Sequence, residues 1–416
     1  MGGLHHLKRK QSTGQVGHRP VQVVALDEIN RKDAIALLMS MLKLDGVSGR
    51  EQPVVDFIKR RLGESGIPES WIRTDQAHRR SPLGGQVGNL ICRLPGTVRG
   101  PRRLLIAHMD TVPLCEGSRP VLRNGCFRSG DPKLAIGADN RSGSALLLLI
   151  AMTLRQRRLP HPPLTFFWSV QEETALTGSR FANVQLLGRP RLAFNWDGGR
   201  PRDLTIGATG DYQLKILVEG LASHAGGHPE DGISAIAIAA RAIADLDQNG
   251  WHGLILKGRQ RGTSNVGIIS GGAATNVVSD RLSLSAEARS HDSSFRRRIV
   301  AEYRKAFERA ARQVKNKRGR CGRVRFHLDL AYESFELDRT DPVVLEAARS
   351  LAKFKIAPRY RIVNGGLDAN WLTARGIPTV SLGCGQRRAH TVKEYLVADE
   401  FFQACRIALE LAMGGS

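Results

Sequence analysis

Several apolar runs in this chain end in a histidine or a carboxylate, and this recurrence limits the possible folds most strongly. The segments LLIAHMD, FFWSVQEE and LAFNWD each begin with a short stretch of apolar or small residues. Strands that are buried on both faces of a parallel sheet have this character. In an open α/β sheet, ligands collect at the carboxyl ends of such strands. The sequence therefore predicts a mostly parallel α/β sheet with His108, Glu173 and Asp197 at one edge.

The order of the predicted elements indicates two domains. At 416 residues the chain is too long for one typical hydrophobic core. In its first half, strands and helices alternate, as they do in a parallel sheet covered by helices. The expected elements there are helices at 30–44, 51–62 and 144–156 and strands at 89–93, 104–108, 164–170 and 192–196.

From about Gly210 apolar and polar residues alternate, which is typical of strands with one solvated face. The expected elements are strands at 212–218, 263–269, 281–289 and 324–330 and helices at 233–246 and 295–314. Their order, β-α-β-β-α-β, is that of a ferredoxin-like α+β domain. A helix at 342–352 and a buried strand at 379–382 then return to the first sheet.

This return means that the second domain interrupts the first one. We expect the first domain to comprise residues 21–209 and 332–416, and the inserted domain to comprise residues 210–331. The first 20 residues are rich in Gly, His and Lys, and we expect residues 1–20 to form a flexible tail.

Charge is the one unusual bulk property of the chain. A formal net charge of +23 can indicate binding to nucleic acid or to acidic surfaces. In the dense basic block from Arg296 to Arg325, however, Phe295, Ile299 and Tyr303 recur at helical spacing. This pattern predicts that the charges form the solvated face of an amphipathic helix. Nucleic-acid binding is kept as an alternative, because the tail and this helix could form a basic patch.

Cysteine usage and hydropathy favour a cytoplasmic protein. Six cysteines are scattered without a CxxC pair, and no apolar signal sequence precedes them. No stretch approaches the roughly 18 apolar residues of a membrane span. We therefore expect a chain that folds without disulfides and does not enter a membrane.

Two motifs place a possible metal ligand at the end of a strand or before a helix. His108 and Asp110 are two residues apart, so their side chains lie on one face, and a carboxylate can orient a zinc-binding imidazole. Asp139 lies in the Gly-flanked loop GADNRSG. Helix capping is the simpler interpretation of Asp139. One carboxylate can, however, bridge two cations.

Glu172 and Glu173 follow the most hydrophobic predicted strand, where two adjacent acids repel unless cations or protons intervene. They could also be an exposed, acidic start of a helix. Successive side chains diverge, so Glu173 could bind metal while Glu172 acts as general base. Asp197 in NWDGG and His390 in RRAHTVKEY complete the set. If Asp139 is shared, each of two metals has three protein ligands and one open position, as catalytic sites do.

With these motifs the chain resembles the M20 family of metallopeptidases and, within it, the peptidase T-like branch, which includes tripeptide aminopeptidases. The matching motifs are AHMDTVP, GADNRSG, the QEE strand end, NWDGG, SHAG, GGAATNVVSD, EARS, GGLDANWLTARGIPTVSLGCG and AHTVKEY. They span most of the chain. The resemblance implies that the first domain is catalytic and that the inserted domain is a lid and dimerisation domain. It also implies a homodimer, short peptide substrates and two zinc ions per subunit, with cobalt or manganese as alternatives.

The resemblance further implies a role for each matching residue. One zinc ion would be held by His108, Asp139 and Asp197, and the other by Asp139, Glu173 and His390. Asp110 would orient His108, and Glu172 would be the general base.

Three residues of the inserted domain also match the family pattern. His224 in SHAG would donate to the developing oxyanion, reaching the site of a neighbouring subunit. Asn276 and Arg289 would bind substrate, and the guanidinium fork of Arg289 suits a peptide carboxylate.

These observations favour a cytoplasmic dinuclear zinc hydrolase that releases the N-terminal residue of a short peptide. Asp rather than Glu at position 197 resembles the aminopeptidase and dipeptidase members. An N-acyl amino acid deacylase, a dipeptidase or a carboxypeptidase could use the same site. A basic nucleic-acid-binding protein with an incidental metal site is the alternative from another class.

Overall fold

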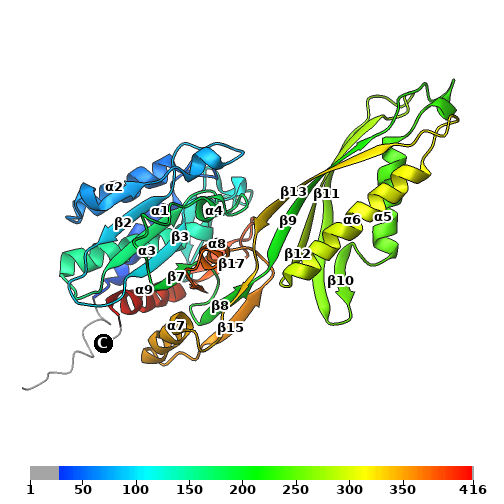
Figure 1. Cartoon of the computed structure of the whole chain (residues 1–416). Helices are drawn as coiled ribbons and strands as arrows, with labels where there is room; N and C mark the ends of the chain where they lie inside the picture. Colours follow the sequence, from blue (N-terminus) through cyan, green and yellow to red (C-terminus); the bar gives the residue numbers. More distant parts are fainter. Residues whose placement is uncertain (1–27, 415–416) are drawn as a thin grey trace, which may run out of the picture.

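The computed structural model describes residues 28–414, and within this range two large hydrophobic cores lie against different sheets. Figure 1 shows a broad α/β body and a long arm that projects from it. The predicted fold class, an α/β domain interrupted by an α+β domain, is confirmed. The tail predicted at residues 1–20 lies outside the described range, and the exact limits of the two domains stay a prediction.

The body is built on a mixed sheet in the order β1-β2-β6-β3-β7-β16-β8-β14, with β15 paired to β8. Its strands are β1 (Ile72–Thr74), β2 (Leu90–Leu94), β3 (Arg103–His108), β6 (Leu164–Ser169), β7 (Leu192–Trp196), β8 (Asp203–Ala208), β14 (Phe335–Glu336), β15 (Arg359–Val363) and β16 (Thr379–Leu382). The central strands β6, β3, β7 and β16 run parallel, whereas β1, β2 and β14 pair antiparallel. The prediction of a mostly parallel sheet therefore holds for the centre and not for the edges, where antiparallel strands are common in α/β folds.

Helices cover both faces of this sheet. They are α1 (Arg31–Leu42), α2 (Gln52–Glu64), α3 (Ala138–Arg157), α4 (Thr177–Arg180), α7 (Pro342–Lys353), α8 (Asp368–Ala374) and α9 (Ala398–Met413). A small antiparallel sheet in the order β17-β18-β5-β4 joins two distant segments; its strands are β4 (Pro120–Arg123), β5 (Cys126–Ser129), β17 (Gln386–Arg387) and β18 (Tyr395–Val397). Helix α9 is almost entirely buried on one side, and the sequence analysis assigned no helix there.

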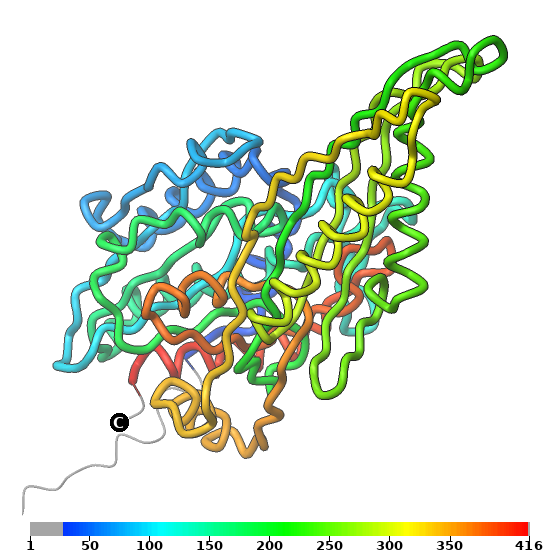
Figure 2. Tube along the Cα trace, turned by 45° about the vertical axis from the view of Figure 1, so that its right-hand side comes forward, coloured from blue at the N-terminus to red at the C-terminus, as the bar shows by residue number. Residues whose placement is uncertain are grey.

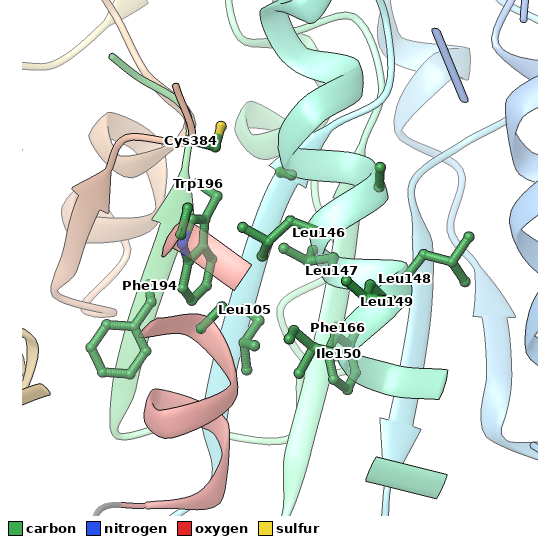
Figure 3. Packing of buried hydrophobic residues seen from close by; sticks show 14 of the residues in the cluster. Leu105, Leu146, Leu147, Leu148, Leu149, Ile150, Phe166, Phe194, Trp196 and Cys384 are labelled. Atoms are coloured by element: carbon green, nitrogen blue, oxygen red, sulfur yellow. The ribbon is translucent and has the colours of Figure 1, made fainter. Parts of the chain in front are cut away.

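Helix α3 is the buried centre of the body. Its run from Leu146 to Ile150 is buried throughout, because other helices cover the side that faces away from the sheet. Figure 3 shows these side chains beside Leu105, Phe166 and Trp196 of the central strands. Near its start the helix almost touches β7, since a Cβ atom on Gly143 would lie 2.2 Å from the Trp196 carbonyl oxygen. This close approach brings the start of α3 to the carboxyl end of β7.

The arm is a five-stranded antiparallel sheet in the order β10-β11-β12-β9-β13. Its elements are β9 (Gly210–Glu219), α5 (Ala235–Gln248), β10 (Gly253–Lys257), β11 (Gln260–Gly271), β12 (Arg281–Ser290), α6 (Ser293–Gln313) and β13 (Arg323–Tyr332). Both helices cover one face, as Figures 1 and 2 show from two directions. The predicted order lacked β10, a short strand of sequence GLILK that exposes Leu254 and Leu256 and buries only Ile255.

The basic block is only partly the solvated helix face that its spacing predicts. Phe295, Ile299 and Tyr303 of α6 are buried against the arm sheet, as expected. Arg296, however, is also fully buried, where it donates to the Ser290 carbonyl oxygen and forms an ion pair with Glu333. A buried guanidinium needs such partners because desolvation of an unpaired charge is costly.

None of the helices in the described part of the chain combines the length and the apolar character needed to span a bilayer. All six cysteines lie in this part and are free, as the sequence predicts.

Candidate functional site

The predicted site residues converge at the carboxyl ends of the central strands. His108 ends β3, Asp197 directly follows β7, and Glu172 and Glu173 follow β6. Asp139 is supplied by the start of α3. Parallel pairing of β3 with β6 and with β7 brings these ends to one edge of the sheet. His390 reaches the same place from the loop between β17 and β18.

Asp139 lies between the two histidines. Its Oδ1 atom is 3.3 Å from His108 Nε2, and its Oδ2 atom is 3.4 Å from His390 Nε2. His390 Nε2 also lies 2.8 Å from Glu173 Oε1. The capping interpretation of Asp139 does not hold: Asp139 and Asn140 are not helical, and it is Asn140 Oδ1 that accepts the Gly143 N–H, at 3.0 Å.

The remaining two acids lie on the other side of His108. Glu172 Oε2 is 4.0 Å from His108 Nε2, and the ligand atoms of His108, Glu172 and Asp197 all lie within 4.8 Å of one another. Glu172 is 8% exposed, so the alternative of a solvated acidic helix start is wrong for this residue.

Burial of several acids together perturbs their protonation. Burial raises the pKa of Glu172 well above its usual range, and the nearby His108 offsets this only in part. Burial and the neighbouring Asp139 raise the pKa of Asp197. The pKa of His390 is raised to about 10, first by its hydrogen bond with Asp139. The cluster thus carries more buried negative charge than its two imidazoles neutralise.

This donor set fits metal ions. The ligand atoms of His108, Asp139 and Glu173 also lie within 4.8 Å of one another. Imidazole nitrogen and carboxylate oxygen are donors that zinc and similar divalent metals accept. A cation among the carboxylates would offset their mutual repulsion, so the buried acids are themselves an argument for metal binding.

Asp110 connects the site to two other segments of the chain. Its carboxylate accepts hydrogen bonds from Ser48 Oγ at 2.7 Å, from the Glu172 N–H at 3.0 Å and from the Glu173 N–H at 3.1 Å. Its Oδ1 atom is also 3.4 Å from His108 Nδ1. The residue therefore fixes the backbone that carries both glutamates as well as the imidazole.

Several supporting residues were missed by the sequence analysis. Glu394 is buried and accepts the N–H groups of Gly137 and Asp139, at 2.8 and 2.9 Å. Asn140 donates from Nδ2 to the Trp196 carbonyl oxygen at 2.7 Å. Glu394 follows His390 by four residues, so its place in the AHTVKEY motif was a usable signal. Ser48 lies in a glycine-containing turn about 60 residues before its partner, and no local pattern indicates it.

A cavity of about 1340 Å³ opens above this cluster, between the body and the arm. Arg289 of β12 lines it together with all the acids and imidazoles described above except Asp110 and Glu394. His224 and Asn276 are not among the described residues that line it. They lie near each other on the exposed loops of the arm, where the Ala225 N–H donates to the Asn276 carbonyl oxygen. If His224 and Asn276 have the predicted roles, they would act at the active site of a second copy of the chain.

Two protein-family models match the chain. The peptidase dimerisation domain of M20 enzymes matches residues 206–315, and the model of peptidase family M28 matches residues 89–227. Among curated proteins, the uncharacterised protein YqjE of Bacillus subtilis is 28% identical over 385 residues, which cover 92% of this chain and 98% of that protein. Peptidase T of Escherichia coli is 23% identical over 368 residues, covering 78% and 85% of the two chains.

Two solved peptidase structures superpose on most of this chain. A tripeptidase from Staphylococcus aureus superposes with a TM-score of 0.82 at 27% identity, over 93% of this chain and 98% of that one. The aminopeptidase PepT from Bacillus cereus superposes with a TM-score of 0.79 at 28% identity, over 93% and 99% of the two chains.

Proposed function

This chain belongs to the M20 family of metallopeptidases and is peptidase T-like, and on that premise we propose that it is a dinuclear zinc aminopeptidase of short peptides. The placement of Asp139 carries the proposal most directly. A carboxylate that points one oxygen at each of two histidines is suited to bridge two cations. The names of the tripeptidase and aminopeptidase relatives support the choice of substrate.

We assign the ligands as the resemblance implies. One ion would be held by His108, Asp139 and Asp197, and the other by Asp139, Glu173 and His390. Two such ions supply Lewis-acid polarisation of a carbonyl group and lower the pKa of a water molecule towards roughly 7. Cobalt or manganese could occupy the same donors.

Glu172 is the proton carrier of the proposed reaction. Its carboxylate accepts a proton from the water that attacks the carbonyl carbon, and it then gives this proton to the amine nitrogen as the C–N bond breaks. The products are a free amino acid and a peptide shortened by one residue. Asp110 accepts the Glu172 N–H and so fixes the backbone from which this carboxylate extends towards His108 and Asp197. Positioned acid–base groups contribute about 10²–10⁴-fold to such reactions.

The arm is proposed to form a homodimer, as the name of its family model suggests. Residues 260–264 of β11 pair with β10, and no described strand pairs with the same edge of β11 beyond them. Ile269 on this stretch is 53% exposed on the helix-covered face of the sheet, and Ile236 of α5 is 50% exposed, whereas Ile268 points to the other face and lines the cavity. A Cβ atom on Gly272 would lie 3.9 Å from Ile236, so the strand end and the helix form one apolar surface.

Analysis of products tests the substrate class. Zinc-loaded and cobalt-loaded protein is incubated with free and N-acetylated di- and tripeptides, and the products are identified by mass spectrometry beside a chelated control. We expect chelator-sensitive loss of the N-terminal residue from free peptides alone. Cleavage confined to acetylated members would show a deacylase. Absence of all cleavage would favour the alternative of a nucleic-acid-binding protein. Its binding to nucleic acid should then weaken steeply as the salt concentration rises.

Glu172→Gln tests the mechanism. The amide has nearly the same shape but cannot carry the proton, so we expect turnover to be abolished while metal content and Tm stay close to those of the wild type. Retained activity would remove Glu172 from the proposed role.

A further inference from the structure

The arm presents the uncovered face of its sheet to the cavity. Helices α5 and α6 occupy the other face, where Leu214, Ile216 and Val218 of β9 are buried. The alternate residues of β9, including Gln213 and Lys215, are exposed on the uncovered face. Both line the cavity, so this wall is polar and is supplied by residues of the arm.

Arg289 lies on this wall, but its charge is already paired. Its Nη2 atom donates to Glu287 Oε2 at 2.7 Å, and its Nε atom is 3.9 Å from Asp211 Oδ1. Its Nη1 atom donates to the Asn364 carbonyl oxygen at 3.4 Å. Two carboxylates therefore compete with any substrate carboxylate for this guanidinium, which argues against Arg289 as the main anion-binding group.

Lys215 is the better placed cation. It makes no ion pair with the residues that the structure describes, and its side chain is exposed to the cavity. Asp329, an acid that lines the same part of the cavity, is held by Arg180 of α4 in a bidentate pair at 2.8 and 2.9 Å. The hydrogen bonds from Arg180 keep the pKa of the Asp329 carboxyl group low, and the charges of His327 and Lys215 add to this effect from a greater distance.

His327 adds a second donor beside Lys215. The register of β9 and β13 places the two residues directly opposite each other, and both line the cavity. Opposed residues of an antiparallel pair have Cβ atoms about 5 Å apart. An ammonium group and an imidazole at that separation can converge on the two oxygens of one carboxylate.

We propose that Lys215, assisted by His327, forms a carboxylate-binding subsite at the arm end of the cleft and determines which peptides the enzyme prefers. The inference rests on the proposed peptidase function and specifies its substrate. The carboxylate is the C-terminus of a short peptide or an acidic side chain of a longer one.

The subsite also favours substrates that extend well beyond the cleaved bond. Lys215 lies four residues beyond Asp211 on the same face of β9, which corresponds to about 13 Å along the strand. An extended peptide gains only about 3.5 Å per residue. A carboxylate level with the Arg289 and Asp211 pair would therefore be short of Lys215 by roughly 3.7 residues of extended peptide.

Matched peptide pairs test this subsite. Ala-Ala-Ala and Ala-Ala-Ala-Ala are compared with their C-terminal amides, and amidated Ala-Ala-Glu-Ala is compared with amidated Ala-Ala-Gln-Ala. The first two pairs report on a C-terminal carboxylate and the third on an acidic side chain. For the wild type we expect kcat/KM to favour the carboxylate member of at least one pair by about fivefold. The difference between the two members of a pair should lie in KM rather than in kcat.

Variants assign that preference to Lys215. Lys215→Met should abolish the preference, and Lys215→Arg should retain it. Arg281→Met is the matched control, because Arg281 is exposed on the uncovered face of the same sheet but does not line the cavity. A wild type that shows no preference in any pair, or a preference that survives Lys215→Met, would overturn the proposal.

Failure of the peptidase proposal is distinguishable from failure of the subsite. If the wild type cleaves none of the peptides, binding of the same pairs to zinc-loaded protein is measured by calorimetry. Tighter binding of the carboxylate members that is lost in Lys215→Met would support the subsite without the peptidase activity. Equal binding of both members would overturn it.

Discussion

Asp110 shows how one buried carboxylate can hold a whole site in place. Its two oxygens accept N–H groups from Glu172 and Glu173, and Ser48 donates a further hydrogen bond. Residues that hydrogen-bond to metal ligands commonly contribute 10- to 100-fold to metal affinity or activity, which corresponds to about 1.4–3 kcal/mol.

Replacing this residue should therefore affect both metal binding and turnover. In Asp110→Asn the amide keeps the size of the side chain but loses one acceptor oxygen for the two N–H groups. We expect kcat/KM and zinc affinity to fall by about 10- to 100-fold. Kinetics and zinc titration measure the two quantities. Ser48→Ala removes a single donor and serves as the milder comparison; equal effects of the two variants would contradict this account.

Asp211 is a buried acid of the arm whose ionisation costs stability. Burial raises its pKa from 3.8 to about 6, although Arg289 opposes this effect. Because the folded-state pKa lies above the unfolded-state value, the favourable contribution is complete below pH 3.8 and is lost as the pH rises through about 6. At neutral pH the carboxylate therefore destabilises the folded state.

Asp211→Asn should accordingly stabilise the protein only at higher pH. We expect a gain in the free energy of unfolding of up to about 3 kcal/mol at pH 8, since two pKa units correspond to about that much. At pH 4 the gain should vanish. Urea denaturation of the wild type and the variant at both pH values measures the difference, and an effect independent of pH would refute the assignment.

At the scale of elements, α8 joins the body to the arm. Asn370 is buried, and its Nδ2 atom donates to the carbonyl oxygens of Thr209 and Glu333 at 2.9 and 2.7 Å. These two carbonyls belong to the two chain segments that cross between the sheets. Trp371 Nε1 donates to the Ala331 carbonyl oxygen at 2.9 Å. Through these side-chain donors, helix α8 holds both chain segments that cross between the body and the arm.

Asn370→Ala should loosen this connection. It leaves two carbonyl groups without their donor, and a buried unsatisfied polar group costs about 1–3 kcal/mol. We expect a loss of about 2–4 kcal/mol in the free energy of unfolding, and faster hydrogen exchange at the start of β9 and the end of β13. Trp371→Phe, which removes one hydrogen bond at a half-buried position, should cost less. A variant as stable as the wild type would show that the crossing segments are held by other contacts.

At the scale of the whole molecule, the uncovered edge of β11 is the feature that we expect to determine dimer formation. A charge placed there would have to be desolvated in the proposed dimer. We expect Ile269→Lys to weaken the dimer at least about tenfold, or about 1.4 kcal/mol, and light scattering over a range of concentrations would measure this. Leu328→Lys is the control, because Leu328 is 41% exposed on β13 at the opposite edge of the sheet. Equal effects, or a monomeric wild type, would refute this interface.

The central strands and the chemistry at their ends could be predicted because both depend on local sequence. A run such as LTFFWS has no charged residue and is buried at every position, as a strand covered on both faces is, and each such run is followed by its polar residue. The helices of the arm were likewise indicated by a repeat of apolar residues. Strand β10 and helix α8 were not, since they are short and their stability comes from neighbours that are distant in the chain.

Sequence alone thus determined which residue types could form the site and on which elements they lie. Only the tertiary structure decided which of them meet. It placed Asp139 between His108 and His390, gave Asp110 its donor from Ser48, and paired Arg289 with acids, while Lys215 forms no ion pair with the described residues. The physical reason is that strand and helix periodicity is local, whereas charge pairing and desolvation depend on groups that only the folded chain brings within a few ångströms.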